Sequence, residues 1–392
     1  MDFQLTDEQL MIREMAARFA ENEIARAANS LDEAELFDRS SFQAMAELGF
    51  TGLPWPEAAG GAGGGFVSFV LVLEELSRVS ASLGAALWAH VYLAAWPLYT
   101  YGSGETKRNY LKALIDGNRI GSGVLPGTVS GSTSLRVGVV ARVEEEAEEE
   151  GYVLDGVQKY VLGGSTADFF IIYAETGLSK AGRRKRYSAF IVERDCPGLV
   201  IQPVMKKLGL RSAGMAHLKF TQSRIPKRQR IGREGQGGPI ARLAAASVRY
   251  GLAAVAAGIA QGAADAALAY AMERTQFGKP IAKHQAIAFM LADMRTAADA
   301  SRLLVYQAAD REDTEGVADD KKSELALAFA ADAAVRSTTQ AVQVFGGYGY
   351  MKEFAVERYM RDAKAVQICK GLELAVPKLP RRKGGRHRHV HG

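Results

Sequence analysis

The glycine-rich stretch 60–65 is the first part of the chain whose residue types could bind a phosphate. A dinucleotide-binding loop leads from a strand into a helix, because the free amides of the helix N-terminus hold the phosphate. Here the flanking patterns are helical, Pro54 and Pro56 precede the run, and the glycine spacing does not match the fingerprint. We therefore interpret the stretch as a flexible connector.

Cysteine and histidine, which often bind metals, are not spaced for that chemistry. Cys196 and Cys369 lie far apart, which argues against a CxxC site or a disulfide framework and favours a reducing cytoplasm. His387, His389 and His391 alternate at the end of the chain, where an extended tail would make them a weak, solvated chelator. No metal site is predicted, and the other histidines show no spacing typical of catalysis.

The elements that must position a site follow the order helix, strand, helix. Thr6 and Gln9 form a capping box in front of an apolar stripe with helical spacing. Helical patterns recur on both sides of the middle segment, at 40–49, 68–79, 105–116, 239–273, 281–311 and 320–344. The last three are rich in alanine, whose small side chain lets helix axes approach closely, as in an antiparallel bundle.

Short β-rich runs broken by turns fill the segment between about 119 and 230. The predicted strands are Val137–Val143, Tyr152–Leu154, Phe169–Ala174, Tyr187–Glu193, Leu199–Val204 and His217–Thr221. They predict a small barrel or sandwich. The sequence therefore predicts an α+β protein with an all-α domain at 1–118, a β domain at 119–230, a helical domain at 231–377 and a basic tail at 378–392.

Length and charge limit the classes of function. A chain of 392 residues exceeds what one hydrophobic core usually holds, so several packed units are expected. Six of its 49 basic residues follow Pro377, where there is no acid, so the net charge of +5 does not indicate a nucleic-acid-binding face. No stretch approaches the ~18 uncharged apolar residues of a membrane span, and no export signal is predicted.

Two long motifs carry a resemblance to a known family. Residues 273–281 read ERTQFGKPI and are followed by Gln285; residues 343–350 read QVFGGYGY and are followed by ERYMRDAK at 357–364. In this order and spacing they resemble the acyl-CoA dehydrogenase family, and the likeness covers most of residues 1–370. The resemblance implies a β-barrel as the middle domain and a four-helix bundle as the C-terminal domain, usually in a homotetramer.

The resemblance also implies a cofactor and a reaction. FAD would lie between the barrel and the C-terminal helices, partly held by a neighbouring subunit. A carboxylate would remove the α proton of an acyl-CoA or acyl-carrier thioester while the β hydrogen leaves as hydride to the flavin. The electrons would pass to an electron-transferring flavoprotein.

The nucleotide end of the implied FAD site matches the family best. The resemblance assigns cofactor contacts to Arg274, Phe277, Gln285, Gln343, Gly346 and Gly347. Arginine suits a forked bond to phosphate, and glycine permits close approach of the backbone. The alternative interpretation is that Arg274 pairs with an acid such as Glu273 and that the glycines only end a helix.

The flavin-ring end departs from the family pattern. An ungapped alignment puts Pro126 where the family has a hydroxyl near the flavin, and leaves Ser132 either as a contact to the CoA moiety or as a turn residue. The family's Lys-x-Trp-Ile-Thr becomes KYVLG at 159–163, and the interval to Asp168 is one residue short. This places Val161 where the family stacks an aromatic ring on the flavin, and Gly163 where the family has a side-chain hydrogen-bond donor to flavin N5.

The catalytic base departs from the pattern as well. Lys370 stands where the family has its glutamate, and a lysine near its reference pKa of about 10.4 is protonated at neutral pH. The alternative base position in some members, one residue before Arg249, is Val248. Three explanations compete: Glu373 swings in from a shortened loop, the protein is a silenced homologue, or the C-terminus is altered.

The sequence as a whole predicts a cytoplasmic FAD-dependent acyl-CoA dehydrogenase. Its expected partners are an acyl thioester, an electron-transferring flavoprotein and further copies of the same chain. Two alternatives remain open at this stage: a relative with other flavin chemistry, and an inactive homologue or subunit that keeps the fold.

Overall fold

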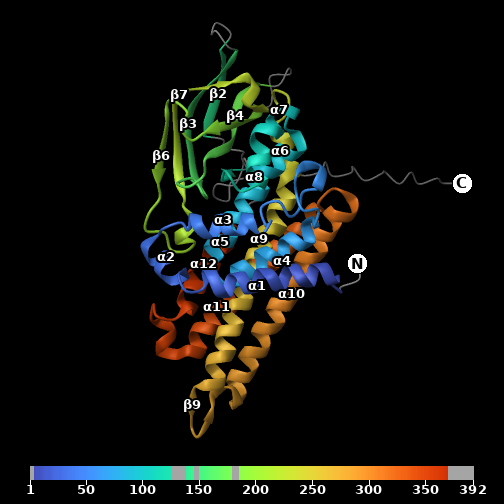
Figure 1. Cartoon of the computed structure of the whole chain (residues 1–392). Helices are drawn as coiled ribbons and strands as arrows, with labels where there is room; N and C mark the ends of the chain where they lie inside the picture. The colour runs from blue at the N-terminus through green and yellow to red at the C-terminus, as the bar shows by residue number, and fades with distance from the viewer. Residues whose placement is uncertain (1–3, 125–137, 145–149, 179–184, 370–392) are drawn as a thin grey trace, which may run out of the picture.

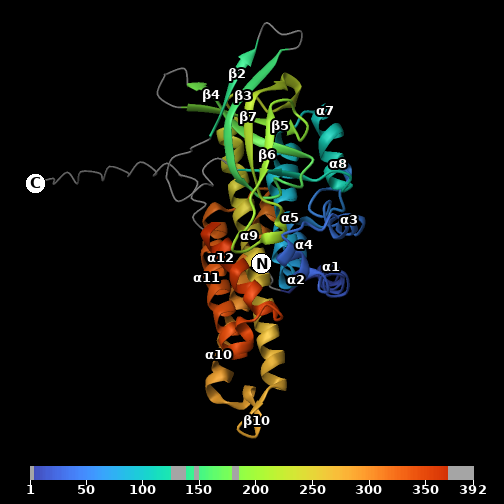
Figure 2. The ribbon, with the colours of Figure 1, turned by 90° about the vertical axis from the view of Figure 1, so that its left-hand side faces the viewer.

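The computed structural model describes residues 4–124, 138–144, 150–178 and 185–369. Helices occupy both ends of the described chain and a sheet lies between them in sequence (Figure 1). The sheet stands at one end of the molecule, the N-terminal helices lie in the middle, and the long C-terminal helices extend to the opposite end (Figures 1 and 2). Ser132, Lys370 and the tail 378–392 lie outside the described residues.

The N-terminal helices begin with the capping box that the sequence predicts. The Thr6 hydroxyl accepts the amide of Gln9, whose side chain accepts the amide of Thr6. The helices are α1 (Asp7–Phe19), η1 (Ala20–Ile24), α2 (Ala28–Ala34), α3 (Arg39–Glu47), α4 (Gly65–Val79), α5 (Ala81–Trp88), η3 (Ala89–Ala95), α6 (Trp96–Tyr101), α7 (Gly104–Thr106), η4 (Lys107–Leu111) and α8 (Lys112–Ile115). The predicted helices at 40–49, 68–79 and 105–116 are confirmed.

The stretch from α5 to α6 was not predicted as helical. Every residue from Ala81 to Leu98 is buried, so no polar face gives the sequence a helical period. Its aromatic residues pack against α9 (Gly237–Glu273): a Cβ on Gly251 of α9 would lie 2.2 Å from the ring of Tyr92. Trp88 also donates its indole N–H to the carbonyl of Val248, at 3.0 Å.

The middle segment forms one mixed sheet. Its strands are β1 (Gly121–Gly123), β2 (Val139–Glu144), β3 (Gly151–Val161), β4 (Phe169–Leu178), β5 (Lys185–Glu193), β6 (Leu199–Pro203), β7 (Ala216–Pro226) and β8 (Arg230–Ile231). They run in the order β6-β7-β3-β2-β4-β5-β8, and β1 pairs in parallel with β4. All six predicted strands are present, and the two short strands β1 and β8 are additional.

The expected β-barrel is not found: in the described part of the chain the sheet is open. Strand β6 pairs only with β7 at one edge, and β8 pairs with β5 through Ala189 and Phe190 at the other. Alternating residues predict which face of a strand is buried, whereas closure depends on pairing between the first and last strands. The sequence pattern therefore could not distinguish a barrel from an open sheet.

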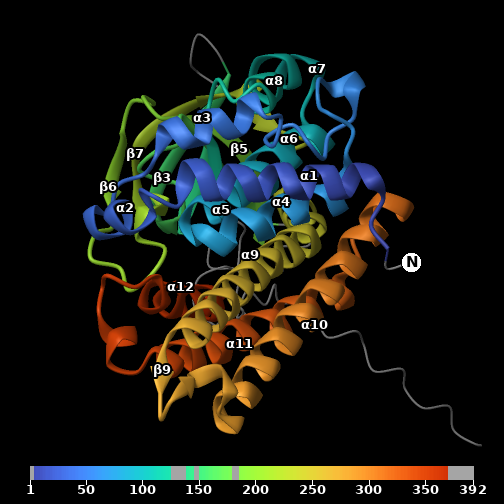
Figure 3. The same cartoon turned by 60° about the horizontal axis from the view of Figure 1, so that its bottom comes forward.

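Four long helices form the C-terminal part: α9 (Gly237–Glu273), α10 (Gln285–Glu315), α11 (Asp320–Phe345) and α12 (Ala355–Cys369). Helices α9, α10 and α11 pack against one another, and α12 packs on α9 and α11 (Figure 3). The short hairpin β9 (Thr275–Gln276) and β10 (Lys279–Pro280) joins α9 to α10. Among the described helices only α9 is long and apolar enough to cross a membrane, and its apolar window is 94% buried inside the protein.

Carboxylates of α4 and α10 fasten these parts together. Glu74 of α4 accepts Arg302 Nε at 2.8 Å and the Tyr306 hydroxyl at 2.7 Å, both from α10. Asp313 of α10 accepts the amides of Phe66 and Val67 at the start of α4. The helix N-terminus that follows the glycine-rich stretch is thus occupied by the protein's own carboxylate, as expected for a connector and not for a phosphate loop.

Candidate FAD-binding site

Arg274 lies where α9 ends and the β9–β10 hairpin begins. Its amide donates to the carbonyl of Tyr270 at 2.8 Å, and its carbonyl accepts the amide of Ile281 at 2.8 Å, so its backbone is fixed on both sides. Its guanidinium carbon lies 5.9 Å from the ring centroid of Tyr348, in the short helix η8 (Gly346–Tyr350). The fold thus brings the two motifs of the sequence together.

The Arg274 side chain makes no ion pair with any described carboxylate. The residue is exposed, and the neighbouring Glu273 is exposed without binding it. The alternative interpretation, in which Arg274 pairs with Glu273 or another acid, therefore has no support among the described residues. An exposed guanidinium on a fixed backbone, without an acidic partner among the described residues, can bind an external anion.

Gly346 ends α11 with a backbone conformation that favours glycine. Its φ of 59° and ψ of −135° lie outside the regions open to residues with a Cβ. A Cβ added at Gly346 or Gly347 would meet no atom within 4 Å, so the backbone here is open to a ligand. Gly346 does end a helix, as the alternative interpretation holds, but its exposed backbone also leaves room for a phosphate.

Aromatic stacking holds the end of α9 against the end of α11. Tyr270 of α9 stacks on Phe345, the last residue of α11, with ring centroids 4.1 Å apart and planes 15° apart. Gln343, two residues earlier, is exposed. The cofactor residues assigned to α11 and η8 are therefore on the surface next to Arg274.

Phe277 and Gln285 lie on the connection between α9 and α10. Phe277 occupies the turn of the hairpin, at the far tip of the molecule in Figures 1 and 2, with φ of 51° and a side chain that is 92% exposed. His284 supports this turn: its Nε2 lies 3.2 Å from the carbonyl oxygen of Gln276. Gln285 is exposed at the first position of α10.

The predicted flavin-ring segment lies at the end of β3. Val161 is fully buried in the sheet and pairs with Ala216, so its side chain cannot face a ligand. Gly163 has φ of 71°, and a Cβ there would lie 3.4 Å from Ser122. The Ser122 hydroxyl donates to the carbonyl of Leu162, which ties this segment to β1.

The candidate base positions are not occupied by a described carboxylate. Val248 lies inside α9 and is 2% exposed, so this position offers an apolar side chain. Lys370 and Glu373 follow the last described residue of α12, Cys369. The assignment of Lys370 to the base position stays a prediction of the sequence.

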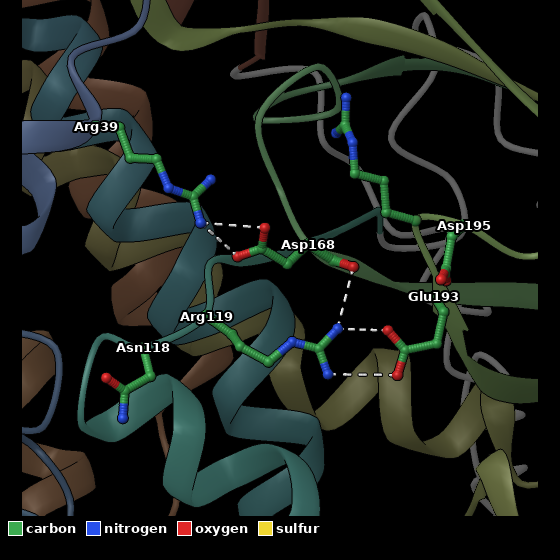
Figure 4. A pocket seen from close by; sticks show the side chains of 7 residues that line it. Arg39, Asn118, Arg119, Asp168, Glu193 and Asp195 are labelled. Carbon is green, nitrogen blue, oxygen red and sulfur yellow. Dashed lines mark hydrogen bonds and ion pairs between the residues drawn. The ribbon is translucent and has the colours of Figure 1, made fainter.

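A separate pocket of about 620 Å³ lies between the N-terminal helices and the sheet (Figure 4). Arg39 donates to both carboxylate oxygens of Asp168, at 3.1 and 2.9 Å, and Arg119 pairs with Glu193. The Asp168 carboxylate also accepts the amide of Ile120 at 2.7 Å. These charges pair with one another and join α3, β4 and β5, so we interpret them as structural; none of the predicted site residues lies here.

Two aromatic residues near the predicted site were not assigned from the sequence. Tyr348, under the Arg274 guanidinium, was part of the second motif but received no role. Tyr160 precedes the buried Val161 and is 55% exposed. The match to the family is one residue short in this segment, and a shift of one residue in a strand exchanges its exposed and buried faces. The gap was therefore a signal that Tyr160, and not Val161, is the exposed residue.

The comparisons with known proteins agree with this arrangement. Residues 6–118, 129–223 and 235–373 match the N-terminal, middle and C-terminal domains of acyl-CoA dehydrogenase. A short-chain specific acyl-CoA dehydrogenase of Clostridium acetobutylicum is 40% identical over 371 residues, which are 95% of this chain and 96% of that protein. The chain belongs to the acyl-CoA dehydrogenase family.

Solved structures show the same fold. Butyryl-CoA dehydrogenase from Megasphaera elsdenii superposes with a TM-score of 0.88 at 35% identity, covering 95% of this chain and 96% of that one. A chain from a study of the electron transferring flavoprotein of Acidaminococcus fermentans superposes with a TM-score of 0.88 at 39% identity and the same coverage. The three-domain arrangement of helices, sheet and helices is therefore that of the family, while the domain boundaries at 118 and 230 stay predictions.

Proposed function

We propose that this protein is an FAD-dependent acyl-CoA dehydrogenase that oxidises an acyl thioester between Cα and Cβ and passes the electrons to an electron-transferring flavoprotein. Family membership and the shared fold support the reaction class. The names of the relatives in Clostridium acetobutylicum and Megasphaera elsdenii support short acyl chains as substrates. The structure from the Acidaminococcus fermentans study supports the electron acceptor.

The observation that carries the proposal is the exposed guanidinium of Arg274, on a fixed backbone, over Tyr348 of the short helix that the open backbone of Gly346 begins. Together with the carboxamides of Gln285 and Gln343, these groups form a donor set without a paired carboxylate, which fits the anionic pyrophosphate of a dinucleotide. Arg274, Phe277, Gln285, Gln343, Gly346 and Gly347 would hold FAD. When bound, FAD supplies the hydride acceptor for the β hydrogen.

A second copy of the chain is part of the proposal. Large apolar side chains are exposed along the C-terminal helices of one protomer, among them Leu268, Met272, Phe289, Leu325 and Phe329. Exposed apolar surface of this extent marks an interaction site. We propose that further copies cover it in a homotetramer, that α9 to α12 act as a four-helix bundle in it, and that neighbouring subunits share each FAD.

The proposed compartment is the cytoplasm. Both cysteines are free: Cys196 is buried and Cys369 is exposed. A chain with free, unpaired thiols suits a reducing environment. A fractionation of the native cells tests this, with recovery in a membrane or exported fraction as the contradicting result.

Purified protein tests the enzyme proposal in two steps. We expect an oxidised-flavin absorbance band, and bleaching of that band by butyryl-CoA under anaerobic conditions. A colourless protein that refuses added FAD contradicts the cofactor. If the protein is yellow but no acyl-CoA of four to sixteen carbons bleaches it, the silenced homologue is favoured. Recovery of bleaching in Lys370→Glu would then assign the loss of activity to the missing base.

A further inference from the structure

His90 lies inside η3 with both nitrogens of its ring bound to the backbone. The residue is 0% exposed. Its Nδ1 accepts the amide of Gly121 at 3.3 Å, and its Nε2 lies 3.1 Å from the carbonyl oxygen of Leu114. Because an amide only donates and a carbonyl only accepts, Nδ1 carries no hydrogen and Nε2 donates its own. These contacts select the neutral imidazole in a single tautomer.

These two bonds connect the N-terminal helices to the sheet. Leu114 belongs to α8, whereas Gly121 begins β1, the strand that pairs in parallel with β4. Strand β1 is closely packed against η3, because a Cβ on Gly121 would lie 2.6 Å from the Cβ of Ala94. Helix η3 is itself a π-helix, a rare geometry that often occurs at functional sites. His90 therefore binds β1 at a junction of unusual geometry.

Strand β1 in turn holds the turn that follows β3. The Ser122 hydroxyl donates to the carbonyl of Leu162. Asp168, at the end of this turn, accepts the amide of Ile120 at 2.7 Å, and its own amide donates to the Ile120 carbonyl at 2.7 Å. A displacement of β1 away from η3 would therefore move Leu162 and with it Gly163, where the family has its donor to flavin N5.

A proton on Nδ1 is incompatible with this arrangement. It would point at the hydrogen of the Gly121 amide and leave two buried donors without an acceptor. Burial lowers the pKa of His90 from 6.5 to about 4; the bond to Leu114 and the carboxylate of Asp168 oppose this shift. The charged side chains that flank the residues around His90 already have partners: Arg39 of α3 pairs with Asp168, Arg119 before β1 with Glu193, and Lys112 of α8 with Asp116.

We propose that neutral His90 is a positioning residue that holds β1 against the N-terminal helices and, through Ser122, fixes the turn at Leu162; protonation of His90 releases both. The release of β1 needs no cofactor, whereas the effect on the flavin rests on the proposed function. Because His90 regains its ordinary pKa once β1 opens, the closed strand is fully favoured above about pH 6.5 and loses this advantage as the pH falls to about 4. The equilibrium constant for opening should rise about 20-fold between pH 7 and pH 5.

Hydrogen exchange followed by mass spectrometry measures this opening in the peptide that covers residues 119–124 of the purified, full-length protein. Exchange is recorded at pH 7 and pH 5 and corrected for the pH dependence of the intrinsic rate. We expect opening to increase about 20-fold in the unmodified protein and less than about threefold in His90→Asn, whose carboxamide oxygen accepts the Gly121 amide but binds no proton. His217→Asn, at a histidine of β7, is the matched control and should keep the full increase. The peptide at 188–193 in β5 should not respond in any variant.

Two further readouts separate the parts of the proposal. His90→Leu offers no acceptor, so at pH 7 its β1 should open about tenfold more readily than that of the unmodified protein, with no response to pH. If His90→Leu does not fold, the comparison with His90→Asn still decides. In FAD-loaded protein, the fluorescence of bound flavin should rise between pH 7 and pH 5 in the unmodified protein and stay constant in His90→Asn.

The outcomes distinguish the role of His90 from the proposed function. Equal pH responses of the 119–124 peptide in the unmodified protein and in His90→Asn would overturn the proposal, whether or not FAD binds. The expected exchange together with an unchanged flavin signal would overturn the link from β1 to the cofactor. If the unmodified protein binds no FAD, the proposed function fails, and the exchange result still decides whether His90 holds β1.

Discussion

Asp362 tests the energetics of the joint between α12 and the segment before β7. Its side chain is 1% exposed, and its Oδ1 accepts the amide of Leu210 at 2.7 Å. Burial raises the pKa of this carboxyl from 3.8 to about 6; Arg358 and Arg361 oppose the rise, and the carboxylate of Asp32 adds to it. We predict that Asp362→Asn removes a pH-dependent part of the stability.

The sign and size follow from proton binding. At about pH 5, a pKa of about 6 leaves roughly nine-tenths of folded molecules protonated at this carboxyl, against less than about one-tenth of unfolded molecules. Because the folded state binds more protons, the stability that this group contributes is complete below about pH 4 and is lost as the pH rises through 6. Between about pH 5 and 7.5 the loss is about 1.4 kcal/mol.

Urea unfolding followed by circular dichroism, at pH 5 and at pH 7.5, measures this loss. The free energy of unfolding of the unmodified protein, relative to that of Asp362→Asn, should fall by about 1.4 kcal/mol between the two pH values. Asp293→Asn, at an exposed position of α10, is the control and should give a constant difference. A change at Asp362 of less than about 0.5 kcal/mol, or one of opposite sign, would refute the argument that this joint is desolvated.

Three further sets of variants test the site and the core. Arg274→Gln should weaken FAD binding about 30-fold, the equivalent of about 2 kcal/mol for a charge-assisted bond, as measured by flavin titration; an unchanged Kd contradicts the phosphate role. Gly346→Ala should lower the free energy of unfolding by about 2 kcal/mol because of its left-handed backbone, and Gly347→Ala, which lacks that strain, should cost less. Arg302→Met should lower the free energy of unfolding by about 3 kcal/mol, because it leaves the buried Glu74 without its cation. The double variant Arg302→Met with Glu74→Gln should recover part of this loss; an equal loss in the single and the double variant would contradict a buried ion pair.

Amphipathic patterns predicted the fold well wherever an element has one buried and one exposed face. Helix α10 and helix α11 show such faces, and both were located within a few residues. The stretch from Ala81 to Leu98 has no exposed face, so its sequence shows no helical alternation of apolar and polar residues although it folds into helices. Helix α12 was not predicted, although its buried residues Val356, Tyr359, Ala363 and Val366 have helical spacing.

The sheet shows a second limit of sequence patterns. Alternation located β2 to β7 but contains no information on whether β6 and β8 meet, so the barrel expectation is not confirmed by the sheet of the described chain. At the end of β3, an ungapped alignment placed the stacking position on Val161. A bulge that moves one residue exchanges the two faces of a strand, and it left Val161 buried and Tyr160 exposed.

Two exposed aromatic residues of the described chain have a strained backbone. Among the described residues two aromatic side chains have a left-handed backbone, Tyr160 at the end of β3 and Phe277 at the tip of the hairpin, and both are more than half exposed. Folding alone gives no reason to hold a large ring in this conformation with its surface in water, because the strain and the exposed apolar area both cost free energy. A ligand or a neighbouring subunit that buries such a ring would offset that cost. For Phe277, which we propose to hold FAD together with Arg274 and the Gly346 backbone, the bound cofactor would supply that burial.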